Sequence, residues 1–168
     1  MCGWDEVADN RPLRGGKGFL WEGGLRVPLI VRWPGVIEPE RTIEAPVIGT
    51  DLFPTFLEAA GAQVPEVCDG VSLVPLLRGE DLERDHLFWH YPNYAWHGTN
   101  RLGGAVRAGR WKLIERYADS SRELYDLALD LGEQKNVAAE HPERVQALST
   151  ALHAHLEQTG ARMPPRRE

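Results

Sequence analysis

One lysine lies in a glycine-rich turn whose composition suits the binding of an anion. Lys17 follows Gly15 and Gly16 and precedes Gly18. Glycines let the backbone approach a ligand closely, and a single ammonium group among them is a compact ligand for an oxyanion. A phosphate-binding P-loop would need Ser or Thr after the lysine, where Gly18 stands. The local pattern therefore leaves two interpretations, an anion-binding lysine and an ordinary surface turn.

The histidines do not have the spacing of a metal site. His153 and His155 are two positions apart on a predicted helix, so their side chains point to different faces. His90 and His97 flank an aromatic segment that has no neighbouring carboxylate, which is a weak pattern for zinc. We therefore predict that this chain holds no metal by its own residues.

No cysteine or serine lies in a recognisable nucleophile motif. Cys2 and Cys68 lack C-x-x-C spacing and are interpreted as free thiols, and no serine stands in a G-x-S-x-G elbow. Asp9 and Asn10 offer two neighbouring oxygen ligands, whereas calcium takes roughly six to eight. A solvated loop or a helix cap is the simpler interpretation of that pair.

Composition favours a globular chain that binds no nucleic acid and does not span a bilayer. The chain has 168 residues, of which 42% are hydrophobic and 26% charged, with a net charge of −6. An acidic balance argues against a nucleic-acid partner, which a basic face would attract. No apolar run reaches the roughly 18 residues of a membrane span, and the first residues lack the basic start and apolar stretch of a signal peptide.

The first half of the chain is predicted to contribute pieces of an α/β sheet. Residues 27–33 form an apolar run ended by Pro34 and Gly35, which is typical of a buried strand. Residues 51–60 are predicted as a helix, with Asp51 as the N-cap. Two or three strands do not complete a doubly wound fold, so we expect the missing strands to precede Met1.

The second half is predicted to be a small antiparallel sheet covered by a helix. Strand candidates are residues 87–91, a hairpin over 105–114 and residues 123–127. A helix is predicted from about Pro142 to Thr159, with an apolar stripe formed by Val145, Leu148, Leu152 and Leu156.

A charged connection at residues 79–86 marks the predicted boundary between these halves. We therefore expect residues 11–80 to form one region and residues 81–163 the other. Residues 164–168 are predicted to be a disordered tail.

The order of these motifs resembles that of the arylsulfatase family. Residues 12–28, Pro-Leu-Arg-Gly-Gly-Lys-Gly-Phe-Leu-Trp-Glu-Gly-Gly-Leu-Arg-Val-Pro, are similar to a glycine-rich signature of that family. The likeness covers about residues 11–163. The later segments that resemble the family, in the same order, are 33–35, 50–55, 69–77, 88–92, 107–113, 123–127 and 130–133.

The resemblance implies an alkaline-phosphatase-like α/β sandwich, incomplete here, followed by a small antiparallel sheet with a C-terminal helix. It also implies an enzyme that hydrolyses sulfate esters, in which the lysine of the signature, here Lys17, contacts the sulfate group. His90 matches a histidine near the substrate pocket in some members. Glu22 and Arg26 match positions that we interpret as structural, as an ion pair that steadies the turn.

The departures from the family concern the catalytic groups. Members use a formylglycine nucleophile made from Cys or Ser in a C/S-x-P-x-R motif, which this sequence lacks. Their calcium is held by acidic residues near that nucleophile and by an Asp-Asn pair further upstream than Asp9 and Asn10. We therefore expect a C-terminal portion of a sulfatase that hydrolyses no ester alone and completes its site with a missing N-terminal half. Family members are commonly periplasmic, secreted or lysosomal.

Two other functions remain open on the sequence. One is a non-catalytic binding or partner module that docks onto a separate N-terminal half. The other is a phosphoryl-transfer relative of the same superfold, because phosphate and sulfate are both tetrahedral anions and a fold alone does not fix the chemistry.

Overall fold

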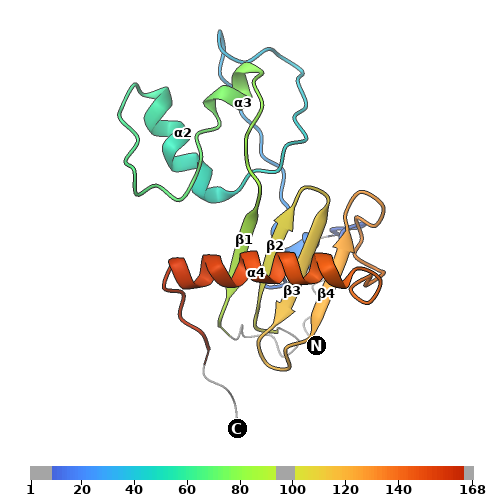
Figure 1. Ribbon diagram of the computed structural model, residues 1–168. Coiled ribbons are helices and arrows are strands. Elements are labelled where there is room, and N and C mark those ends of the chain that lie inside the picture. The colour runs from blue at the N-terminus through green and yellow to red at the C-terminus, as the bar shows by residue number, and fades with distance from the viewer. Residues whose placement is uncertain (1–8, 94–100, 165–168) are drawn as a thin grey trace. The chain divides into compact units, whose positions relative to one another are not determined.

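The computed structural model describes residues 9–93 and 101–164, and the chain divides into two compact units (Figure 1). The larger unit contains residues 1–28 and 85–168, and the smaller one contains residues 29–84. Residues 11–28 thus group with the C-terminal sheet, whereas the sequence analysis grouped them with the residues up to 80.

The larger unit is built on a four-stranded antiparallel sheet with the order β1-β2-β3-β4. Gly109, with φ +56°, lies in the turn between the central strands, in the left-handed region that glycine adopts without strain. The predicted strands and the hairpin are confirmed, with small differences at their ends. The strands are β1 (Leu87–Tyr91), β2 (Gly103–Ala108), β3 (Trp111–Arg116) and β4 (Arg122–Asp126).

Helix α4 (Pro142–Gln158) covers one face of this sheet, as predicted (Figure 1). Val106 lies opposite Leu113, and Leu113 lies opposite Leu124, so these three side chains form one apolar row across the sheet. The helix packs on this row with the stripe that its sequence predicts, Val145, Leu148, Leu152 and Leu156. No helix among the described residues is long and apolar enough to cross a membrane.

The glycine-rich segment and the short helix α1 (Glu22–Leu25) cover the opposite face. Leu20 is buried there against Ala105 and Ile114 of the central strands, and against Tyr125 of β4. Because both faces are covered, the central strands bury nearly all of their residues. The segment that carries Lys17 is therefore part of the core of this unit.

The smaller unit is organised around the buried carboxylate of Asp51. The 3-10 helix η2 (Gly49–Asp51) leads into α2 (Leu52–Ala59), and α3 (Val74–Arg78) follows later, so the predicted helix start at Asp51 is confirmed. Asp51 accepts hydrogen bonds from both terminal nitrogens of Arg84 at 2.8 and 2.6 Å. It also accepts the backbone amides of Ile48 and Val71. One carboxylate thereby joins three separate segments.

The strand predicted at residues 27–33 is wrong. Residues 29–84, all of which the structure describes, contain only helices and irregular segments, and Ile30 is 91% exposed. A strand requires a neighbouring strand to satisfy its backbone donors and acceptors. The apolar pattern is present, but this unit supplies no partner strand for it.

Leu152 provides a test of how α4 is held. Its side chain is fully buried, so Leu152→Ala should lower the free energy of unfolding by about 2–5 kcal/mol, through lost burial and the cavity left behind. Denaturant unfolding followed by circular dichroism measures this. The matched change Leu129→Ala, at a residue 83% exposed, should shift stability by less than about 0.5 kcal/mol. Equal effects of the two changes would contradict the described packing.

Candidate functional site

Lys17 lies in a tight loop that backbone hydrogen bonds close. The amide of Gly23 donates to the carbonyl of Arg14 at 2.9 Å, and within this loop the amide of Phe19 donates to the carbonyl of Gly16 at 3.1 Å. The side chain of Lys17 is exposed and makes no hydrogen bond or ion pair with any described residue. Its ammonium group is therefore available to a ligand.

The glycines of the signature make this loop possible. Gly15 and Gly18 have φ values of +72° and +90°, which a larger residue adopts only with strain. A Cβ atom at Gly24 would overlap the carbonyl oxygens of Phe19 and Gly16. The glycine spacing is thus explained by the fold of the loop itself, before any ligand is considered.

A fully buried lysine lies beneath the loop. Lys112 of β3 donates a hydrogen bond from Nζ to Oε1 of Glu22 at 2.8 Å. The same ammonium lies 3.0 Å from Oε1 of Glu133 as an ion pair. Nη1 of Arg107 approaches the second oxygen of Glu22 at 3.8 Å. Two cations therefore balance two buried carboxylates, as the low polarity of such a site requires.

The ion pair expected between Glu22 and Arg26 is wrong. Glu22 is 2% exposed and directs its carboxylate to Lys112, whereas the side chain of Arg26 is exposed. Within the described part of the chain, Glu22 and Arg26 meet through a backbone hydrogen bond, in which the amide of Arg26 donates to the carbonyl of Glu22 at 2.7 Å. Glu22 is structural, as expected, but its partner comes from the sheet.

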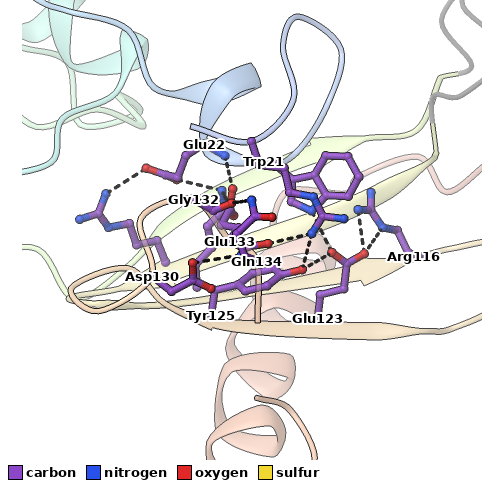
Figure 2. Close-up of polar contacts among 12 residues, drawn as sticks. Trp21, Glu22, Arg116, Glu123, Tyr125, Asp130, Gly132, Glu133 and Gln134 are labelled. Atoms are coloured by element: carbon purple, nitrogen blue, oxygen red, sulfur yellow. Dashed lines mark hydrogen bonds and ion pairs between the residues drawn. The ribbon is translucent and has the colours of Figure 1, made fainter. Parts of the chain in front are cut away.

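Glu133 holds the loop at two points (Figure 2). Its Oε2 accepts the backbone amide of Glu22 at 2.5 Å, and its carbonyl oxygen accepts Nη1 of Arg14 at 2.8 Å. Burial raises the pKa of Glu133 above its ordinary value, although the ammonium of Lys112 opposes this.

A second polar network fixes the aromatic end of the loop (Figure 2). Arg14 lies 3.9 Å over the ring of Trp21 and donates to the hydroxyl of Tyr125 at 3.0 Å. Trp21 and Tyr125 each donate to Oε2 of Glu123 at 2.8 Å, and Arg116 donates to its other oxygen. Burial alone would raise the pKa of Glu123, but these donors outweigh it and the pKa is lowered. Glu123 is therefore a carboxylate at neutral pH.

His90, the second residue predicted to bind substrate, lies elsewhere. Its Nδ1 is 2.6 Å from the hydroxyl of Tyr117 and its Nε2 is 3.0 Å from the carbonyl oxygen of Arg162. Gly104, its register partner, lies against Leu152, so His90 is on the face that α4 covers. The segment carrying Lys17 covers the other face, and the structure does not bring the two together. The role of His90 stays a prediction, and His97 is outside the described residues.

The residues that position the loop were missed by sequence reasoning. Lys112 and Glu133 are each fully buried, yet their types suggest solvated surface positions. The one available signal was the rarity of lysine in this sequence, combined with the place of Lys112 in an apolar strand. The described residues contain no group of three His, Cys, Asp or Glu side chains that could hold a metal.

Comparison with known proteins identifies this region. The family model for N-sulphoglucosamine sulphohydrolase, C-terminal, matches residues 16–162. A protein named sulfatase from Formosa agariphila is 42% identical over 158 residues, which cover 86% of this chain and 28% of that protein. The chain thus spans just over a quarter of the length of this relative.

Solved structures show the same arrangement of elements. One, in complex with its substrate D-glucosamine-2-N,6-O-disulfate, is 30% identical with a TM-score of 0.59, covering 70% of this chain and 25% of that one. A phosphonate monoester hydrolase from Silicibacter pomeroyi is 29% identical with a TM-score of 0.60, covering 76% and 28% respectively.

The buried carboxylate of Glu133 predicts a pH dependence of stability. Because burial raises its pKa above 4.5, the folded state holds the proton more tightly, and stability falls as pH rises through the folded-state pKa. Glu133→Gln removes this titration. The melting temperature of the variant minus that of the wild type should therefore increase from pH 4.5 upward, measured by calorimetry across pH. A difference that shrinks as pH rises would show that the pKa is not raised.

Proposed function

Since this chain belongs to the sulfatase family, we propose that it is the C-terminal part of a sulfate-ester hydrolase in which Lys17 contacts the sulfate group. The observation that carries the proposal is the exposed ammonium of Lys17, which has no partner among the described residues, on a loop that backbone hydrogen bonds close. A charged donor held in this way suits an oxygen of a tetrahedral anion.

Lys17 would act by electrostatics. When a sulfate ester is cleaved, negative charge develops on oxygen, and a donor already in position stabilises it without reorganisation at that moment. The backbone hydrogen bonds of the loop supply such a fixed position. A lysine ammonium has no lone pair, so in this charged form it is neither a nucleophile nor a base that could activate water.

The remaining catalytic groups are proposed to come from a part of the enzyme outside this chain. The family's calcium needs several oxygen ligands, and the described residues contain no group of three candidate ligands. The formylglycine motif is missing from the sequence. A calcium ion therefore does not fit the residues that the structure describes on their own.

A phosphoryl substrate is the second candidate. The likeness to a phosphonate monoester hydrolase supports it, with 29% identity and a TM-score of 0.60. Sulfate and phosphate present similar oxygens to one ammonium group, so the two candidates share the same contact and differ in which anion binds more tightly.

The three lysines of this chain allow a direct test of the anion contact. With lysine-selective isotope labelling, the side-chain NMR signal of Lys17 should shift saturably on titration with sodium sulfate, against sodium chloride at equal ionic strength. Lys112 is fully buried and Lys135 pairs with Glu140 at 3.0 Å, so both should respond much less.

The controls are two variants that each remove one positive charge. Lys17→Gln should abolish saturable sulfate binding, and Lys135→Gln should leave it intact. An equal, non-saturating response of Lys17 and Lys135 would refute the proposed contact. Tighter binding of inorganic phosphate than of sulfate would favour the phosphoryl candidate.

The isolated chain is expected to hydrolyse no sulfate ester, because it lacks the formylglycine motif that would supply the nucleophile. Pure protein incubated with an aryl sulfate and calcium should release no phenol above background. Turnover that disappears in Lys17→Ala would overturn this expectation and place a complete active site within the chain.

A further inference from the structure

We propose that Glu133 is a positioning residue, which holds both ends of the loop that carries Lys17 and so fixes the backbone from which its ammonium group extends. The proposal rests on the proposed function of Lys17 as the sulfate contact. It also makes a claim about the loop itself that is testable without a ligand.

The two contacts of Glu133 flank the loop in the sequence. Its carbonyl oxygen accepts Nη1 of Arg14 at 2.8 Å, directly before Gly15. Its carboxylate accepts the amide of Glu22 at 2.5 Å, directly after Trp21. Both ends of residues 15–21 are thus attached to one residue of a different segment (Figure 2). A movement of Glu133 would be transmitted to the whole loop.

The backbone of Glu133 is an independent sign that its side chain matters. Its φ is +50°, a left-handed conformation that is strained for a non-glycine residue. The preceding residue, Gly132, lies so close to Pro12 that a Cβ atom would come within 3.0 Å of its carbonyl oxygen. By its backbone conformation alone, position 133 would suit glycine. A non-glycine residue keeps such a strained conformation only where the contacts around it hold it there.

The turn around Glu133 is itself fixed by one carboxylate. Oδ1 of Asp130 accepts the amide of Gln134 at 3.0 Å, and Oδ2 accepts the amide of Lys135 at 2.8 Å. The amide of Glu133 donates to the carbonyl of Asp130 at 3.1 Å. Glu133 therefore lies in a turn that several hydrogen bonds hold in place (Figure 2). A positioning role requires such a support.

Two substitutions separate positioning from general stability. Glu133→Gln keeps an oxygen that can accept the amide of Glu22 and removes a buried charge, while Lys112 still pairs with Glu22. Glu133→Gly removes the side chain and relieves the backbone strain. Both remove one negative charge, so their comparison cancels any general effect of charge on anion binding.

Amide hydrogen exchange by NMR is the test without ligand. In Glu133→Gly, the amides of Phe19 and Gly23 should exchange at least roughly tenfold faster relative to the amides of β3, because the loop opens locally. In Glu133→Gln, their protection should stay within about twofold of the wild type. Unchanged loop protection in a folded Glu133→Gly variant would refute the proposal.

A second variant covers the case in which Glu133→Gly does not fold. Arg14→Gln releases one end of the loop from the Glu133 carbonyl, together with the contacts of Arg14 to Tyr125 and Trp21, and keeps the Glu133 and Lys112 side chains.

Arg14→Gln should accelerate exchange of Phe19 and Gly23 without altering the β3 amides. Loop protection that survives this change in a folded protein would also refute the proposal. Tyr125→Phe, which removes the hydroxyl alone, is the matched control and should leave the exchange of Phe19 and Gly23 within about twofold of the wild type.

The sulfate titration of Lys17 completes the test. Sulfate affinity should fall at least about fivefold in Glu133→Gly and stay near the wild-type value in Glu133→Gln. Equal affinity in both variants would overturn the positioning role. If wild-type Lys17 does not respond to sulfate, the proposed function fails. The exchange experiment still decides whether Glu133 holds the loop.

Discussion

The buried ammonium group of Lys112 is the constraint on which this face of the sheet depends. A charge removed from water must be paired, and no carboxylate on β3 itself faces this ammonium. Its partners come from α1 through Glu22 and from the turn after β4 through Glu133. Pairing one lysine with both glutamates therefore fixes two distant segments to the sheet and to one another. Buried ion pairs are weak evidence for stability, but they specify which segments meet.

The loop that carries Lys17 is held by contacts with the segments packed beneath it. Its ends are attached to Glu133, and its aromatic residue Trp21 donates to Glu123 at 2.8 Å. At Gly24 the neighbouring carbonyl oxygens leave no room for a side chain. None of these contacts uses the side chain of Lys17. Such an arrangement fixes the backbone from which the Lys17 side chain extends before a ligand arrives, and electrostatic stabilisation depends on a support of this kind.

Sequence reasoning predicted the elements that local patterns determine. The strands and α4 follow from apolar periodicity, and the predicted small antiparallel sheet with a C-terminal helix is confirmed, within a family of alkaline-phosphatase-like fold. Lys17 was predicted as the anion contact from its glycine-rich context and the family resemblance, and this role stays a prediction. Lys112 and Glu133 were missed because both contact Glu22 from far away in the sequence. Lys112 is 90 positions from Glu22 and Glu133 is 111 positions from it, and no local pattern indicates such a pairing. The strand predicted at 27–33 failed for a related reason, since a strand depends on a neighbour that this unit does not supply.

The distribution of carboxylates explains how Lys17 stays free for an anion. Lys112 has two glutamates and Lys135 has Glu140, so each of the other lysines is matched with an internal acidic partner. Within the described part of the segment before Lys17, the carboxylate of Asp9 is occupied by Arg11. After Lys17, the carboxylate of Glu22 is turned into the core. An acidic side chain beside Lys17 would compete with an oxyanion for its ammonium group and weaken binding. Burying Glu22 against Lys112 therefore has two effects, because it fixes the loop and directs the first carboxylate that follows Lys17 in the sequence into the core.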